Sequence, residues 1–283
     1  MSTTGEYQDC YVAFLDVLGF RQLVERSVDH PALLLQLSGI TTFAASPRSG
    51  AKQTSFGPCP MQVRAFSDSI VVFTPAQHAN GNACNPLAQL CFVVRYLHDR
   101  ILELDACIRG GITVGKMYWH PSWSDAASTP KRGSRGAQPI TFGPGLNAAY
   151  DLENQKGSPP RVLVSDTIQN VATTQHMQAW PFAGHGTMLQ HVFRTDPVGK
   201  KAHLDLLNAR VVRYDGEKMR TSSGGFTVTW KTMAGSGHGK TLARARALAQ
   251  AGVKVNAACE RVRPKYEWLR DYCAASEGQY LSP

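Results

Sequence analysis

The 283-residue chain lacks any apolar run near the roughly 20 residues that a membrane-spanning helix needs. Its first ten residues, MSTTGEYQDC, have neither the basic start nor the apolar stretch of a secretory signal. The seven cysteines form no Cys-x-x-Cys pair, so zinc-ribbon and dithiol redox motifs are absent from the sequence. An odd number of cysteines without such spacing is typical of reduced, buried thiols. We therefore expect a cytoplasmic protein with no membrane partner.

Charged residues are also scarce, at 18% of the chain, whereas apolar residues make up 43%. This balance excludes intrinsic disorder and supplies enough apolar side chains for a buried core. The net charge of +9 suits an anionic ligand. Because the basic residues are scattered and no nucleic-acid-binding motif is present, we expect no nucleic acid partner.

The order of apolar segments predicts an α/β sandwich with a mixed sheet and helices on one face. Residues 10–17, CYVAFLDV, are typical of a buried strand, and a helix over 20–43 follows, which Pro31 interrupts. Further strands are expected at 62–66, 70–73, 107–114, 161–165 and 225–231, and further helices at 86–104, from about 146, from about 166, at 240–260 and at 262–275.

We predict two parts in the chain: a catalytic domain over residues 8–212 and a helical extension over 213–283 that packs on the same domain. Residues 44–61 are rich in proline, glycine and serine, and residues 120–138 are polar and basic. Both segments are therefore expected to be long exposed loops.

Two aspartates stand where strands end. Asp16 closes the first strand, and Asp68 lies in the turn between the next two. If these strands are neighbours, both carboxylates emerge at one edge of the sheet, where they can hold one or two Mg²⁺ or Mn²⁺ ions. Either aspartate alone is more typical of a turn residue that bonds its own backbone. The other motifs of the chain favour the metal-binding interpretation.

Two glycine-rich strings accompany these aspartates. Residues 107–116 contain the pattern R-x-G-I-x-x-G, and residues 143–150, GPGLNAAY, put Asn147 near a helix start. In this order, the four features resemble the catalytic domain of class III nucleotidyl cyclases, over residues 8–170. The strings AFLDVLGF, AFSDSIVVF, IRGGITVG, FGPGLNAAYDLE and KYEWLRDY look most like the Pycsar pyrimidine nucleotide cyclases of bacterial anti-phage defence.

The resemblance implies a head-to-tail homodimer with its active sites at the interface. Asp16 and Asp68, with the backbone of Val17, would hold two Mg²⁺ or Mn²⁺ ions. Asn147 of the partner subunit would orient the ribose. The triphosphate would lie against four residues at a helix start, where unpaired backbone N–H groups favour anions. These four residues are Val17, Leu18, Gly19 and Phe20.

Arg64 stands four residues before Asp68, where purine cyclases often carry a base-reading lysine or glutamate. An arginine there can donate paired hydrogen bonds to the carbonyl edge of uracil or cytosine. A surface arginine paired with a nearby carboxylate is an equally weighted alternative. We interpret Arg109, at a strand end, as a structural residue that bonds loop carbonyls.

The chain departs from purine cyclases at two positions. Asp151 replaces the arginine that stands four residues after the asparagine and stabilises the transition state. Residues 140–141, Ile-Thr, replace the base-reading residue before Gly143. Both departures argue against a standard adenylate or guanylate cyclase. The candidates for a replacement cation are Lys156, Arg161 and Lys200.

We predict an enzyme that converts UTP to 3′,5′-cyclic UMP and pyrophosphate. The cyclic UMP would serve as a second messenger for a downstream cyclic-nucleotide-gated effector. Conversion of CTP to cyclic CMP is the close alternative. A non-catalytic nucleotide-sensing module is a second alternative, although both aspartates and Asn147 are retained. A third is a P-loop NTPase, because residues 234–241, AGSGHGKT, match a relaxed phosphate-loop pattern. It is disfavoured because no strands follow that would build a parallel sheet.

Overall fold

The computed structural model describes residues 6–45, 61–77, 86–118, 141–155, 159–174, 192–196, 201–207, 214–220, 226–232 and 236–280. Its strands are β1 (Tyr7–Leu18), β2 (Gln62–Phe66), β3 (Ser69–Pro75), β4 (Cys107–Tyr118), β5 (Val162–Val164), β6 (Phe193–Thr195), β7 (Ala202–Leu204), β8 (Tyr214–Arg220) and β9 (Phe226–Thr232). Its helices are α1 (Phe20–Ser27), α2 (Pro31–Ala45), α4 (Pro86–Leu102), α5 (Pro144–Glu153), α6 (Asp166–Thr174), α7 (Ser236–Val255) and α8 (Arg263–Tyr280).

Seven strands form one mixed sheet in the order β2-β3-β1-β4-β5-β7-β6, which confirms the predicted fold class. The central strand β1 is antiparallel to both β3 and β4, whereas β4 and β5 are parallel. In this register Asp16 lies opposite Ser69 on β3 and opposite Arg109 on β4. Asp16, Ser69 and Arg109 therefore project from the same face of the sheet.

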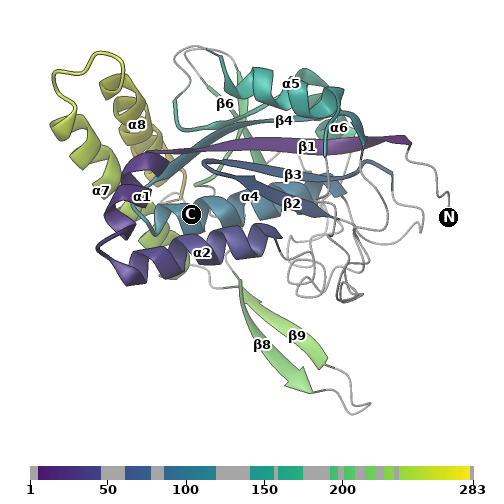
Figure 1. Ribbon diagram of the computed structural model, residues 1–283, viewed down its shortest axis with the longest axis horizontal. Coiled ribbons are helices and arrows are strands. Elements are labelled where there is room, and N and C mark those ends of the chain that lie inside the picture. The colour runs from purple at the N-terminus through teal and green to yellow at the C-terminus, as the bar shows by residue number, and fades with distance from the viewer. Residues whose placement is uncertain are drawn as a thin grey trace.

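Helices cover both faces of the sheet, so the prediction of helices on one face is wrong (Figure 1). Ala13 and Leu15 of β1 pack into the same core cluster as α4, whereas Val12 packs with Ala149 of α5 on the other side. The physical reason lies in CYVAFLDV itself. Its apolar residues occupy both phases of the strand, and a strand that is apolar on both sides must be covered on both.

The long helices match their predicted positions. The apolar stripe of α4 is buried, including Leu87, Leu90 and Val94, as its 3.6-residue periodicity requires. Pro31 begins α2 and thereby separates it from α1, because proline fits the first turn of a helix but not its interior.

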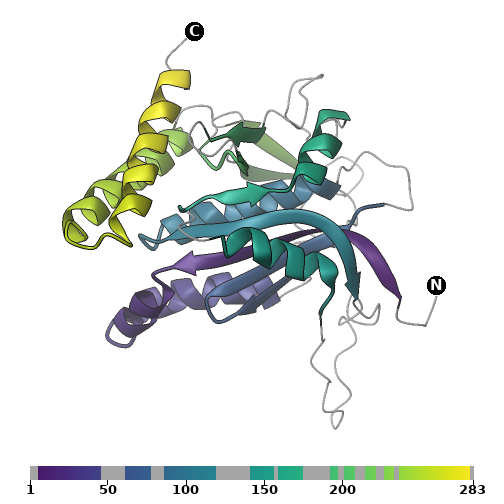
Figure 2. The same ribbon diagram turned by 90° about the horizontal axis from the view of Figure 1, so that it is seen from above.

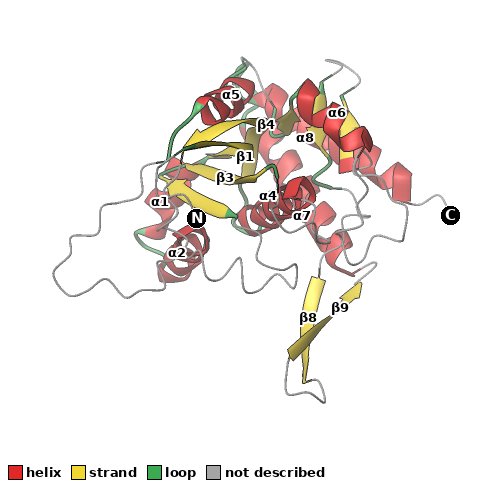
Figure 3. Ribbon diagram, turned by 90° about the vertical axis from the view of Figure 1, so that its right-hand side faces the viewer, coloured by secondary structure: helices red, strands yellow, loops and turns green. Residues whose placement is uncertain are grey.

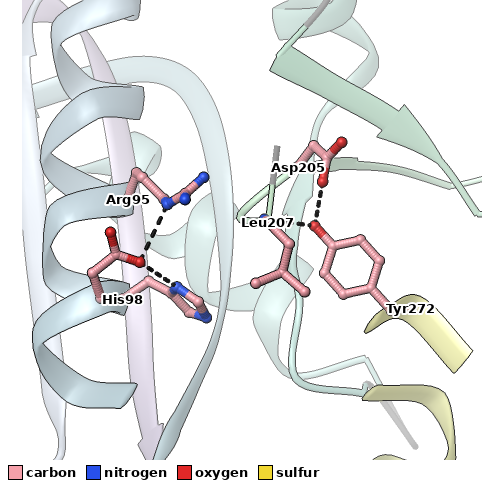
Figure 4. A network of polar contacts seen from close by, with 6 residues as sticks. Arg95, His98, Asp205, Leu207 and Tyr272 are labelled. Carbon is pink, nitrogen blue, oxygen red and sulfur yellow. Dashed lines mark hydrogen bonds and ion pairs between the residues drawn. The ribbon is translucent and has the colours of Figure 1, made fainter. Parts of the chain in front are cut away.

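Helices α7 and α8 form an antiparallel pair beside the carboxyl end of β1 (Figure 2). They share an apolar cluster with Cys107 and Leu207 of the sheet domain. The two helices approach closely at Gly252, where an added Cβ would lie 2.1 Å from the ring of Tyr266. The Tyr272 hydroxyl of α8 reaches further, into a buried polar network (Figure 4).

The residues between the sheet and α7 form an antiparallel hairpin, β8–β9, which projects from the body of the molecule (Figure 3). The segment assigned to a helical extension therefore begins with a hairpin, and the division of the chain at residue 212 stays a prediction. The expected loop at 120–138 and most of the one at 44–61 lie outside the described residues. Among the helices described, none is both long and apolar enough to cross a bilayer.

Candidate functional site

Asp16 and Asp68 lie at the same edge of the sheet. The backbone N–H of Val17 donates a 2.8 Å hydrogen bond to the carbonyl oxygen of Asp68. Asp16 pairs with Ser69, the residue that follows Asp68. The turn is tight, since Ser67 has a left-handed φ of 56°. The β2–β3 turn thus holds the exposed Asp68 beside the end of β1, where the Asp16 side chain is 16% exposed.

Arg109 bonds carboxylates rather than loop carbonyls, which corrects its interpretation from the sequence. Its Nε donates a 2.8 Å hydrogen bond to Oδ2 of Asp16 and lies 2.6 Å from Oε1 of Glu153. The Nε carries a single hydrogen, and this hydrogen points toward Asp16. Among the described residues, Glu153 Oε1 therefore has no hydrogen-bond partner.

Glu153 lies at the end of α5 with a side chain only 4% exposed. Burial raises the pKa of this carboxyl, Arg109 opposes the shift, and Asp16 and Asp68 reinforce it. The charges of Asp16 and Asp68 thus act on Glu153, and we call these three carboxylates the acidic cluster. The Arg109 guanidinium, which contacts Asp16 and Glu153, offsets part of this negative charge.

A second cation comes from the far end of the chain. Lys265, in the first turn of α8, is half-buried. Burial lowers the pKa of its ammonium, and the charges of Arg109 and Arg261 lower it further, while Asp16 and Glu153 oppose the shift. Lys265 therefore lies within electrostatic range of the acidic cluster.

The segment from Val17 to Phe20 joins β1 to α1 beside this cluster. Val17 is buried and Leu18 ends the strand, and Gly19 then turns the chain with a left-handed φ of 80°. Phe20 begins α1, and the Gly19 carbonyl accepts the first helical hydrogen bond, 3.1 Å from the Leu23 nitrogen. The first turn of α1 thus directs unpaired backbone N–H groups toward the sheet edge, where they attract anions.

Arg64 lies on the edge strand β2, opposite Val71 of β3, which in turn is opposite Phe14 of β1. It therefore projects from the same face as Asp16, at a separation of roughly 12 Å from the strand spacings. The guanidinium donates to the carbonyl of Val63 at 3.1 Å and to Oε1 of Gln62 at 3.0 Å.

The Nε of Arg64 is a buried donor with no hydrogen-bond partner in the described part of the chain. Burial also lowers the pKa of this guanidinium. None of the described hydrogen bonds of Arg64 goes to a carboxylate. Its side chain projects from the same face of the sheet as Asp16. A ligand acceptor there would satisfy the Nε donor.

Asn147 is not brought to the acidic cluster of its own chain. The face of α5 that packs on the sheet contains Gly145, Ala149 and Glu153. Asn147 is two residues from both Gly145 and Ala149, which turns it to the opposite, exposed face of the helix. It also lies about 9 Å along the helix axis from Glu153.

The structure removes Arg161 from the candidates for the replacement cation. Its side chain is 10% exposed and forms an ion pair and hydrogen bond with Asp196. Trp268 of α8 donates to the same carboxylate at 3.2 Å. Arg161 is therefore committed to the docking of α8. Lys156 and Lys200 lie outside the described residues.

The residues at the sheet edge fit a divalent cation by their chemistry. Hard carboxylate oxygens from Asp16 and Asp68, with a backbone carbonyl such as that of Val17, are the ligands that Mg²⁺ and Mn²⁺ prefer. The Arg109 contact uses Oδ2 of Asp16. The described residues contain no group of three or more His, Cys, Asp and Glu side chains poised to hold a metal. A metal would thus depend on two carboxylates.

The phosphate-loop string at 234–241 does not have the context that a P-loop needs. Helix α7 begins at Ser236, so most of the string is helical. The preceding strand β9 pairs with β8 in an antiparallel hairpin rather than with the main sheet. A P-loop joins a strand of a parallel sheet to the following helix.

Sequence reasoning missed Glu153 and Lys265 and misread Arg109. The only signal was that Glu153 ends the string FGPGLNAAYDLE and that Lys265 begins the string KYEWLRDY. Both strings carry the resemblance, but the resemblance assigns no role to these two residues.

Comparisons with known proteins give little similarity. No protein-family model matches the chain, and no curated protein matches it. One solved structure that resembles part of it is a class III adenylyl cyclase-like ATP-binding protein from Pseudomonas aeruginosa, at 10% identity and a TM-score of 0.37. The match covers 59% of this chain and 35% of that one, so this chain spans about a third of that protein. No function is assigned by this similarity.

Proposed function

We propose that the chain is a nucleotide cyclase that converts UTP to 3′,5′-cyclic UMP and pyrophosphate. One observation carries the proposal: Asp16 and Asp68 meet at a sheet edge directly beside the left-handed Gly19 and the first turn of α1. This juxtaposition offers oxygen ligands for metal ions next to backbone donors for phosphate oxygens. It is the arrangement that a metal–triphosphate substrate needs.

The chain would bind and orient the nucleotide so that its own ribose attacks. The 3′-oxygen bonds to the α-phosphorus, the bond from that phosphorus to the oxygen of the β-phosphate breaks, and pyrophosphate leaves. The proton of the 3′-hydroxyl passes to solvent. Asp16, Asp68 and the Val17 carbonyl would hold Mg²⁺ or Mn²⁺, which would lower the pKa of that hydroxyl and neutralise phosphate charge. The first turn of α1 holds the triphosphate oxygens.

Arg64 is proposed to read the base. It projects from the same sheet face as Asp16, at a separation on the scale of a nucleotide, and it has a buried Nε without a partner. A guanidinium can donate paired hydrogen bonds to the carbonyl edge of a pyrimidine. Because uracil and cytosine share the O2 carbonyl, CTP is the alternative substrate.

The site is proposed to be completed by a second copy of the chain in a head-to-tail homodimer. Asn147 faces away from the acidic cluster of its own chain, so it can serve a nucleotide only at another molecule's Asp16 and Asp68. Asn147 of the partner subunit would then orient the ribose. The resemblance to the Pycsar cyclases is the support for a messenger role in anti-phage defence, with an effector that responds to the product.

A non-catalytic nucleotide sensor is the second candidate, since the same residues would bind a nucleotide without turning it over. The deciding experiment incubates the purified chain with each of the four NTPs separately, with Mn²⁺ or Mg²⁺, and identifies products by mass spectrometry. We expect cyclic UMP and pyrophosphate from UTP. A cyclic purine product would overturn the pyrimidine assignment, and nucleotide binding without any product would favour the sensor.

A further inference from the structure

The buried face of α8 leads directly to the acidic cluster. Leu269 and Cys273 of α8 are buried in the apolar cluster that contains Cys107 and, at its margin, Leu18. Leu18 and Cys107 are paired across β1 and β4, two residues beyond the pair of Asp16 and Arg109. Helix α8 therefore packs at the end of the two strands that hold this pair.

Lys265 continues that buried face by one turn. It precedes Leu269 by four residues, and residues four apart in a helix lie on the same side. Lys254 on α7, by contrast, is exposed. The half-buried position of Lys265 thus follows from the helix periodicity, which places it on the side of α8 that packs on the sheet domain.

Buried contacts hold α8 in this place. The indole N–H of Trp268 donates to Asp196 at 3.2 Å, and the Tyr272 hydroxyl accepts a 3.1 Å hydrogen bond from the backbone of Leu207 and donates to Asp205. These anchors lie within two turns of Lys265. The backbone of a residue in the first turn of such a helix is already fixed, so its side chain loses less conformational entropy when it binds a ligand.

We propose that the ammonium of Lys265 binds the phosphate oxygens of the nucleoside triphosphate held at Asp16 and Asp68 of the same chain. The inference rests on the proposed function, and it names a cation for a site whose expected arginine position is occupied by Asp151. A lysine suits the role because its compact charge carries three donors on a flexible stem.

The electrostatic surroundings agree with this assignment. Burial lowers the pKa of Lys265, the charges of Arg109 and Arg261 lower it further, and those of Asp16 and Glu153 oppose the shift. With one guanidinium already bound to Asp16, a second cation beside it creates a positive region at the edge of the acidic cluster. A polyanionic triphosphate that arrives with divalent cations neutralises both sets of charges.

The test measures the binding of inorganic tripolyphosphate with Mn²⁺ by isothermal titration calorimetry. Lys265→Met is compared with Lys265→Arg, which keeps the charge, and with Lys254→Met, a matched loss of an exposed lysine. We expect Lys265→Met to weaken binding by about tenfold to a hundredfold, the range for a charge-assisted contact. Lys265→Arg should retain binding within a few-fold, and Lys254→Met should match the wild type.

Equal affinity of Lys265→Met and wild type would overturn the inference, as would a wild type that binds no tripolyphosphate. Weaker binding that Lys265→Arg fails to rescue and that accompanies a fall in Tm would also overturn it, because Lys265 would then only support the fold. Turnover of UTP is measured separately. If Lys265→Met forms cyclic UMP with unchanged affinity for tripolyphosphate and unchanged KM for UTP, the role of Lys265 is refuted and the cyclase function stands. If Lys265→Met loses tripolyphosphate binding but the wild type forms no cyclic product, the cyclase function is refuted and the role of Lys265 stands.

Discussion

Arg109 and Asp16 lie directly opposite each other on β4 and β1, and the Arg109 Nε donates a 2.8 Å hydrogen bond to Oδ2 of Asp16. The same Nε lies 2.6 Å from the buried Glu153 at the end of α5. One guanidinium therefore fixes the Asp16 carboxylate and connects the central strand with the helix above it. A metal ion that binds Asp16 meets a carboxylate that is already held in place.

Replacement of either aspartate at the sheet edge should abolish turnover. Asp16→Asn and Asp68→Asn each remove a proposed metal ligand, and we expect cyclic nucleotide formation to fall by more than about 100-fold, beyond the loss typical of residues that only support a ligand. Product formation is measured over a Mn²⁺ titration. Asp9→Asn, on the same strand but exposed and paired with Lys116, should stay active. Full activity in both site variants would remove the metal assignment.

Arg64→Ala should change which base is used rather than whether metal binds. The guanidinium lies on the face of the sheet that holds Asp16 but two strands away, so its loss leaves the carboxylates intact. We expect the ratio of kcat/KM for UTP to that for CTP to fall toward one, with an unchanged Mn²⁺ dependence. Arg26→Ala, which removes an exposed arginine from the last turn of α1, is the control. An unaltered UTP-to-CTP ratio in Arg64→Ala would take Arg64 out of the base pocket.

Tyr272→Phe should destabilise the protein. The Tyr272 hydroxyl accepts a hydrogen bond from Leu207 and donates to Asp205, and all three groups are buried (Figure 4). Loss of the hydroxyl leaves a buried donor and a buried carboxylate without this partner, at a cost of about 1–3 kcal/mol. Urea denaturation measures the change. Tyr150→Phe, which alters a half-exposed ring, should have little effect, and equal stability of the two variants would contradict the network's role.

Stability should decline in mild acid because of His203. Its buried ring packs edge-on against both Trp268 and Tyr272, and burial lowers its pKa, although the Leu204 carbonyl and Asp205 oppose the shift. Folding thus disfavours the protonated ring. The stability that neutral His203 contributes is fully present above the histidine pKa of the unfolded chain, about 6.5, and is lost as the pH falls below that value.

The pH dependence is measured as the urea midpoint between about pH 7 and pH 5, the window below the unfolded histidine pKa. We expect His203→Gln to be less stable than wild type at neutral pH but to lose less on acidification. His30→Gln, at an exposed histidine, should keep the wild-type slope. A slope in His203→Gln equal to that of wild type would assign the acid sensitivity to other groups.

The fold was predictable where the pattern is long. The 17 residues of α4 repeat their apolar positions through almost five turns, and β1 is apolar from Cys10 to Leu15. The three-residue strands β6 and β7 were missed because so short a segment has no periodicity. Strand β8 was missed because its sequence, YDGEKMR, is polar, and the strand is held by pairing with β9.

The site was predictable only in part, for a different reason. Asp16 and Asp68 stand in sequence contexts that reveal strand ends, so their meeting follows from the assumption that the strands are neighbours. The contact between Arg109 and Asp16 joins residues 93 positions apart, and Lys265 comes from a helix whose docking depends on Asp196 and Asp205. Such proximity is a property of the packing of whole elements, and no local pattern contains it.

We propose that one catalytic site combines Asp16 and Asp68 of one chain with Asn147 of the partner subunit. Mixing two inactive variants, Asp16→Asn and Asn147→Ala, and measuring cyclic UMP formation from UTP with Mn²⁺ tests this shared site. In a random mixture half of the dimers are mixed, and each has one intact site of two, so about one quarter of wild-type activity should return. We expect this rescue from two inactive parents. A mixture as inactive as the separate variants, or an active Asn147→Ala parent, would contradict it.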